Sequence, residues 1–167
     1  MQMSPPAAPL HASALRAALG GFATGVTVVT CRGDEGQAVG LTVSSFNALS
    51  LEPPLVLWSL RLVSPSLAAF DQASHFAINV LAEGQVDLSR RFASGQPDKF
   101  DDGGWSAGVG GAPVLAGCAA TFECLCWSRQ TAGDHRLFIG QVLGIQSQPV
   151  PPLVYHGGRY HLLGEIL

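Results

Sequence analysis

The chain has 167 residues and a formal net charge of −3; 47% of its residues are hydrophobic and only 13% are charged. This length fits one domain with a single core. The nine Lys and Arg residues are too few and too scattered for a nucleic-acid-binding surface, and no apolar run approaches the roughly 20 residues of a membrane-spanning helix. Soluble domains have about 25% charged residues, so we expect a partner subunit or a ligand to cover part of this surface.

The start of the chain and the cysteines bear on compartment and on metal binding. Residues 1–9 lack a basic stretch followed by an apolar core, so they do not resemble a signal peptide. We expect a cytoplasmic protein with a flexible tail at residues 1–12 and one domain at residues 13–167. The four cysteines form no CxxC pair, and Cys124 and Cys126 would share one face of a strand. Free thiols are therefore expected, and no metal site.

The first half of the chain predicts a helix, a hairpin and a strand–helix–strand unit. An Ala- and Leu-rich helix is expected at residues 13–23, capped by Ser13. Turn residues 32–37 separate two β-branched segments, as in a hairpin. The expected order is helix 13–23, strands 26–31, 38–43 and 55–60, helix 67–72, and strand 75–81.

The second half of the chain predicts one more helix and then only strands. Charged and apolar residues alternate at helical spacing over residues 85–92, and the glycine-rich residues 98–111 are expected to form an adaptable loop. Further strands are expected at residues 119–128, 137–146, 153–155 and 160–163. Because strand and helix do not alternate after Phe92, the pattern indicates a mainly β protein, a β-barrel with short helices.

Common catalytic and nucleotide-binding motifs are missing. Neither glycine-rich segment has the GxGxxG spacing of a Rossmann unit, and GxxxxGK[ST], GxSxG and HExxH do not occur. Any nicotinamide must therefore bind in another way.

The most informative segment is Gly40-Leu41-Thr42-Val43-Ser44-Ser45-Phe46-Asn47, an apolar strand that ends in three hydroxyls and an amide. Hydroxyls and backbone N–H groups at a strand end can hydrogen-bond an anion without carrying a charge themselves. An ordinary polar turn has the same composition, and the segment alone leaves both interpretations open.

Several strings in fixed order resemble the flavin reductase-like family over about residues 13–163. The strings are GVTVVT (25–30), GLTVSSF (40–46), SLEPPLV (50–56), HFAINVL (75–81), RFA (91–93), DKF (98–100), GDH (133–135) and YHGGRY (155–160). This resemblance implies an FMN-binding split barrel of Greek-key type. It also implies a reductase in which NADH or NADPH reduces FMN or FAD, supplying reduced flavin to a monooxygenase component, and a homodimer with sites at the subunit boundary.

The resemblance also implies the residues of the site. Those expected to bind the cofactor are Thr42, Val43, Ser44, Ser45, Ser59, Ser64, Ser66, Asn79, Val80, Lys99, Phe100 and Tyr160, and His135 is expected at the nicotinamide as the catalytic residue. Ser64 and Ser66 precede a helix, where simple capping is the alternative to phosphate binding. For the amide of Asn79 we favour a ligand contact over a structural role.

Several alternatives stay open from the sequence. Lys99 fits a phosphate contact or a solvated loop lysine, and His135 fits a surface turn as well as a site. Arg136 is a further candidate for the phosphates of the pyridine nucleotide. A non-catalytic flavin carrier is the alternative function, and a split barrel that binds haem or another ligand is a third, although no His is placed as an axial ligand.

Overall fold

Within residues 10–166, which the computed structural model describes, the chain forms twelve strands, three α-helices and one 3-10 turn. The predicted tail falls largely on residues 1–9, which lie outside the described residues. The elements in chain order are α1 (Ala12–Gly20), β1 (Thr24–Gly25), β2 (Thr27–Arg32), β3 (Ala38–Val43), β4 (Asn47–Leu51), β5 (Pro54–Arg61), α2 (Leu67–Gln72), β6 (His75–Val80), α3 (Val86–Ala93), β7 (Trp105–Ala107), η1 (Val109–Gly111), β8 (Pro113–Leu115), β9 (Ala120–Ala132), β10 (His135–Ser147), β11 (Val154–His156) and β12 (Arg159–His161).

Seven of these strands form one antiparallel sheet in the order β3-β2-β6-β9-β10-β5-β4. β5 and β6 follow each other in the chain but are separated in the sheet by β10 and β9, so the connection through α2 crosses over two strands. The sheet is curved so that the end of β3 lies close to β5. There the Ser45 hydroxyl forms hydrogen bonds with the backbone of Ser59. The mainly β barrel predicted from the sequence is therefore confirmed.

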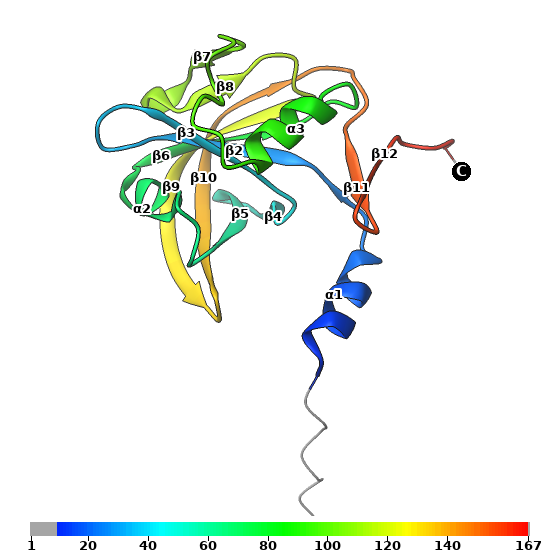
Figure 1. Ribbon diagram of the computed structural model, residues 1–167. Helices are drawn as coiled ribbons and strands as arrows, with labels where there is room; N and C mark the ends of the chain where they lie inside the picture. The colour runs from blue at the N-terminus through cyan, green and yellow to red at the C-terminus, as the bar shows by residue number, and fades with distance from the viewer. Residues whose placement is uncertain (1–9, 167) are drawn as a thin grey trace, which may run out of the picture.

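The smaller elements lie around this barrel. β1, β11 and β12 form a three-stranded sheet, and β7 pairs with β8 in a separate hairpin. Figure 1 shows α3 lying across the sheet and α1 standing away from the barrel next to β11 and β12. The long β9–β10 hairpin projects beyond the other strands in the same view (Figure 1).

Two apolar clusters pack on opposite sides of β2. Trp58 is central to the barrel interior: its ring stacks on Phe138 with centroids 4.5 Å apart and meets Phe70 of α2 edge-on at 4.9 Å. The other cluster joins Val28 and Phe92, so α3 is fixed to the outside of the sheet. Alternation along β5 sends Val56, Trp58 and Leu60 into the core and leaves Ser59 and Arg61 on the outer face.

Some predicted elements need correction. The first helix begins at Ala12 after His11, which makes no side-chain cap, and it ends at Gly20, so the Ser13 cap and the end at residue 23 are wrong. The glycine-rich segment 98–111, expected to be a loop, contains β7 and η1. Among the described residues, no helix is long and apolar enough to cross a membrane.

Candidate functional site

The polar end of β3 lies where three hollows of the surface meet. The largest, here called the β3–β5 groove, has a volume of about 490 Å³ and shares Ser44 with two neighbours of about 220 Å³ and 370 Å³. The lining residues of the groove are Leu41, Thr42, Val43, Ser44, Ser45, Ser59, Leu60, Arg61, Val63, Ser64, Pro65 and His135. Seven of the predicted site residues are thus brought together by the closure of the barrel.

The hydroxyls at this strand end have different partners. The Ser45 hydroxyl donates to the Ser59 carbonyl and accepts from the Ser59 N–H, both at 3.0 Å, so it joins β3 to β5. The Thr42 hydroxyl donates to the Ser89 carbonyl of α3 at 2.7 Å. Ser44 is exposed, and its hydroxyl has no hydrogen-bond partner among the described residues. Ser44 is therefore the hydroxyl here that is free to meet a ligand, whereas Ser45 and Thr42 shape the wall.

His135 lies at one end of the groove, at the first residue of β10, directly opposite Arg61 of β5. Its Nδ1 is 2.7 Å from the Asp134 carboxylate, which fixes the ring and leaves Nε2 as the unengaged nitrogen. The hydrogen bond from His135 is also the main reason that the pKa of Asp134 is lowered. The structure thus places His135 on a strand rather than in the turn, with its ring oriented by a carboxylate.

Ser66 and Lys99 line a separate hollow of about 400 Å³, which meets the groove at Pro65. The Lys99 ammonium lies 3.4 Å from the Gly40 carbonyl and 3.3 Å from the Phe92 carbonyl, and burial lowers its pKa. Ser64 stays in the groove, where its hydroxyl accepts the Ser66 N–H at 3.3 Å. Lys99 therefore has partners within the protein and lies outside the groove itself.

Asn79, for which a ligand contact was favoured, lines none of these hollows, and its amide has its partners within the protein. Its side chain is fully buried; Nδ2 donates to the Val28 carbonyl at 3.1 Å and to Thr30 at 3.3 Å. Oδ1 accepts the Leu115 N–H at 2.9 Å and the Thr121 hydroxyl at 3.4 Å. The amide is satisfied inside the protein and ties four strands together.

Two more predicted cofactor residues lie away from the groove. Val80 lines none of the hollows described here, and its carbonyl accepts the Ala119 N–H at 2.8 Å. Phe100 packs edge-on against Phe92 and Trp105, with centroids 4.9 Å and 5.7 Å away, so its ring belongs to the outer cluster. Phe100 therefore lies in the outer cluster and outside the groove.

Tyr160 lines the neighbouring hollow of about 220 Å³ together with Thr42 and Ser44. Its hydroxyl lies 2.9 Å from the Ser89 hydroxyl, and Ser89 is fully buried. Since Ser89 also accepts the Thr42 hydroxyl through its carbonyl, α3 holds both the end of β3 and the β11–β12 hairpin. Ser89 was not predicted from the sequence, where it looks like any small residue of a helix.

Of the two arginines near His135, the one predicted from the sequence lies outside the groove and the other lines it. Arg136, the predicted phosphate candidate, is paired with Asp71 of α2 at 3.2 Å and lines none of the hollows. Arg61, which was not predicted, lines the groove. Strand alternation gives the signal for it, because Arg61 follows Ser59 by two residues and so lies on the same face.

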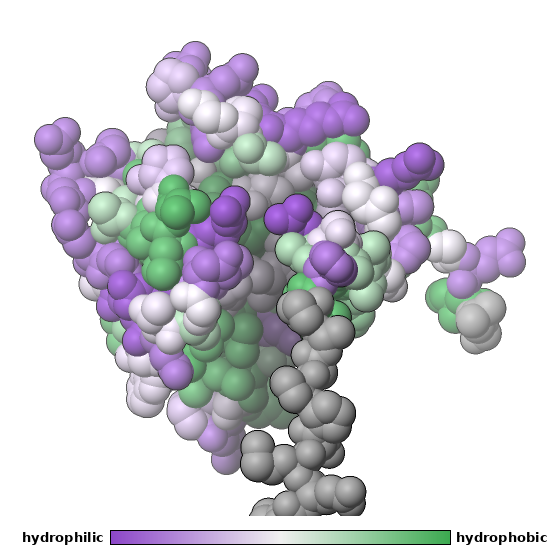
Figure 2. Space-filling model, turned by 60° about the horizontal axis from the view of Figure 1, so that its bottom comes forward, coloured by the Kyte–Doolittle hydropathy of each residue, from purple (hydrophilic) through white to green (hydrophobic). Residues whose placement is uncertain are grey.

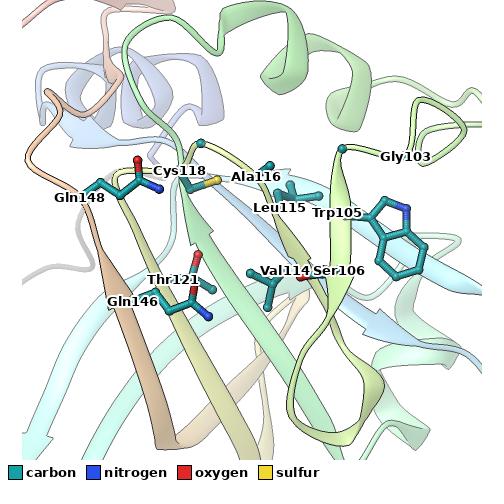
Figure 3. Close-up of a pocket in the computed structure, with 12 residues that line it drawn as sticks. Gly103, Trp105, Ser106, Val114, Leu115, Ala116, Cys118, Thr121, Gln146 and Gln148 are labelled. Carbon is teal, nitrogen blue, oxygen red and sulfur yellow. The ribbon is translucent and has the colours of Figure 1, made fainter.

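A further pocket of about 310 Å³ lies between the β7–β8 hairpin and the ends of β9 and β10. Figure 3 shows Thr121, Gln146, Gln148 and Cys118 around it, with Val114 and Ser106 on the hairpin side. Its lining residues include no charged side chain and none of the predicted site residues. We therefore assign no cofactor role to this pocket.

The four cysteines are free, as predicted, and Cys31, Cys118 and Cys124 are buried. Burial raises the pKa of Cys31 and of Cys124 to about 12 and that of Cys118 to about 11. Within residues 10–166 no group of three or more His, Cys, Asp or Glu side chains has the arrangement of a metal site.

Sequence comparison gives matches along most of the chain. The sequence model described as "Flavin reductase like domain" matches residues 19–164. An FMN reductase (NADH) of Agrobacterium fabrum is 44% identical over 150 residues, which cover 90% of this chain and 85% of that protein. The reductase component of a flavin-dependent trigonelline monooxygenase of Acinetobacter baylyi is 42% identical over 87% of this chain; the match covers 47% of that protein.

Solved structures give the same result for the fold. The NADH:FAD oxidoreductase of Streptomyces globisporus, solved in complex with NAD and FAD fragments, superposes with a TM-score of 0.85 and 36% identity. The superposition covers 90% of this chain and 91% of that protein.

Proposed function

The chain belongs to the family of flavin reductase-like proteins, as its sequence predicts, and on this premise we propose that it transfers a hydride from NADH to FMN or FAD. It is an oxidoreductase, and the comparisons do not favour the alternative of a non-catalytic flavin carrier. We propose further that the reduced flavin is passed to a monooxygenase component, because relatives such as the trigonelline enzyme's reductase work beside one.

The observation that carries the proposal is the position of residues 42–45 at the junction of the three hollows. The groove falls within the roughly 300–1,000 Å³ typical of small-molecule sites. It combines apolar side chains, such as Leu41 and Val63, with the hydroxyls of Ser44 and Ser64. This mixture fits a flat heteroaromatic ring, whose faces are apolar and whose edge carries hydrogen-bonding groups.

In this proposal the residues of the chain bind and orient the flavin and the nicotinamide. Ser44 and Ser64 offer hydrogen bonds to the flavin, Leu41 and Val63 cover apolar ring surface, and His135 positions the nicotinamide through its unengaged nitrogen. A bound flavin supplies the hydride-accepting chemistry itself. The contribution of the chain is to stack the two rings and to keep water from between them.

Turnover and site are tested by two experiments. The purified protein is mixed with FMN or FAD and with NADH or NADPH, and nicotinamide absorbance is followed in air; no oxidation with any pair would refute the reductase. For the site, Ser44→Trp should fill the junction of the three hollows and prevent flavin binding, so that the fluorescence of added flavin is no longer quenched. The matched control is Ser128→Trp, because Ser128 is also exposed, lies on β9 and lines none of the hollows described here.

We also propose a homodimer. Apolar side chains are exposed on α1, on the edge strand β4 and in the last residues of the chain; among them are Leu19 (63% exposed), Leu51 (91%) and Leu162 (67%). Figure 2 shows apolar surface on the face that includes the lower end of the barrel. Exposed apolar surface of this kind is typical of subunit contacts.

The assembly is measured by light scattering after gel filtration. Leu19→Glu should shift the protein toward the monomer, and Val109→Glu on η1 is the control. A monomeric wild-type protein would contradict the dimer. The cytoplasmic location stays a prediction, and the four free thiols fit a reducing compartment.

A further inference from the structure

Six of the nine cationic side chains already have partners in the folded chain. Arg90, Arg91 and Arg136 pair with carboxylates, and Arg32, Lys99 and Arg129 donate to backbone carbonyls. Within residues 10–166, the side chains of Arg16, Arg61 and Arg159 make neither a hydrogen bond nor an ion pair. Of these three, Arg61 alone lines the β3–β5 groove.

The position of Arg61 is fixed by the sheet on one side and by a turn on the other. It is the last residue of β5, paired with His135, and on the groove side of the strand with Ser59. Its carbonyl accepts the Ser64 N–H at 2.9 Å, so a turn brings Ser64 back beside it. The positive charge of Arg61 contributes slightly to the lowered pKa of Asp134. The Asp134 carboxylate is, however, hydrogen-bonded to His135 and forms no ion pair with the guanidinium.

We propose that Arg61 binds phosphate oxygens of a nucleotide substrate at the mouth of the groove. A guanidinium presents a planar fork of donors that matches a phosphate, and a side chain without internal partners breaks no hydrogen bond or ion pair within the protein to bind one. The proposal rests on the reductase function, and it assigns the role that the sequence suggested for Arg136 and Lys99 to a residue that lines the groove. The phosphate comes either from the flavin or from the nicotinamide dinucleotide.

The flavin arm is an equilibrium titration that needs no turnover. FMN and phosphate-free riboflavin are titrated into wild type, Arg61→Ala, Arg61→Lys and the control Arg159→Ala, and flavin fluorescence is recorded. If the flavin supplies the phosphate, Arg61→Ala weakens FMN binding about tenfold and leaves riboflavin unchanged, since one charge-assisted hydrogen bond contributes on the order of 1.5 kcal/mol. Arg61→Lys should retain part of the FMN affinity, because it keeps the charge and loses the fork.

The nicotinamide arm is a steady-state comparison of NADH with reduced nicotinamide riboside, which has no phosphate. If the dinucleotide supplies the phosphate, Arg61→Ala raises KM for NADH about tenfold at unchanged kcat and leaves KM for the riboside unchanged. Either selective loss supports the proposal and identifies the source.

The proposal is overturned if Arg61→Ala changes neither FMN affinity nor KM for NADH. It is equally overturned if Arg61→Ala weakens riboflavin binding as much as FMN binding, or raises KM for the riboside as much as KM for NADH. A wild-type protein that binds FMN but oxidises neither NADH nor NADPH would refute the reductase function and leave the flavin arm valid. A wild-type protein that binds no flavin and oxidises neither NADH nor NADPH would overturn both.

Discussion

Replacement of Asn79 by alanine tests whether the amide of this residue has a structural role or contacts a ligand. The side chain donates to Val28 of β2 and accepts from Leu115 of β8, at 3.1 Å and 2.9 Å, within a site that excludes water. The variant leaves the Leu115 N–H and the Val28 carbonyl buried without these partners. An unsatisfied buried donor costs about 1–3 kcal/mol, and each ordinary hydrogen bond lost costs about 1 kcal/mol.

The expected loss in the free energy of unfolding is on the order of 3 kcal/mol. For a chain of this size, each kcal/mol lowers Tm by about 2–4 °C, so Tm should fall by about 6–12 °C. Calorimetry and urea unfolding measure this loss, with Gln130→Ala as the exposed control on β9, which should stay within about 0.5 kcal/mol of wild type. FMN affinity below the unfolding transition should be unchanged.

Two results would refute the reasoning. One is a variant as stable as wild type, because the hydrogen bonds would then contribute nothing. The other is a folded variant with greatly weakened FMN binding, because the amide would then contact the flavin after all.

Three further changes have definite expected outcomes. Tyr160→Phe and Ser89→Ala each remove the same 2.9 Å hydrogen bond, so a double-mutant cycle on unfolding free energy should give a coupling of about 1 kcal/mol; additive losses would exclude it. Gly40→Ala would place a Cβ 2.8 Å from a phenylalanine ring carbon and should destabilise the fold by about 1–3 kcal/mol, whereas Gly84→Ala, with open space around it, should have no effect. The Cys31 thiol, with its pKa raised to about 12, stays protonated at mildly alkaline pH, so iodoacetamide should label it only after denaturation; labelling of the native protein at the same rate would contradict its burial.

Elements with local signals were predicted well, and elements formed by pairing alone were not. The helix Leu67–Gln72 and the strand Ala38–Val43 have the predicted bounds, because turn residues mark both ends. β4 and the β7–β8 hairpin were missed, because strands of five and three residues are too short for a clear sequence pattern and are formed by pairing with a neighbour. β9 runs four residues beyond its predicted end, because its polar continuation is held by pairing with β10 and not by burial.

Seven of the residues predicted for the site lie together in the β3–β5 groove, but the partners of the polar groups were not predicted. The sequence shows that Ser45, Asn79 and Lys99 carry hydrogen-bonding groups; it does not show that the backbones of Ser59, Leu115 and Gly40 already engage them. Such partners come from strands distant in the chain, so only the folded sheet reveals them. The same limit explains why Arg61, whose side chain is free, was overlooked in favour of Arg136.

Helix α1 has nine residues and buries none of them, and it stands clear of the barrel (Figure 1). A helix of this length is not stable by itself in water, because nucleation costs more than so few turns recover. The surface of the second subunit would stabilise this helix in the proposed dimer. In the proposed dimer, association and local folding are one coupled equilibrium: on dilution, helical circular dichroism should decline before the signal of the barrel changes.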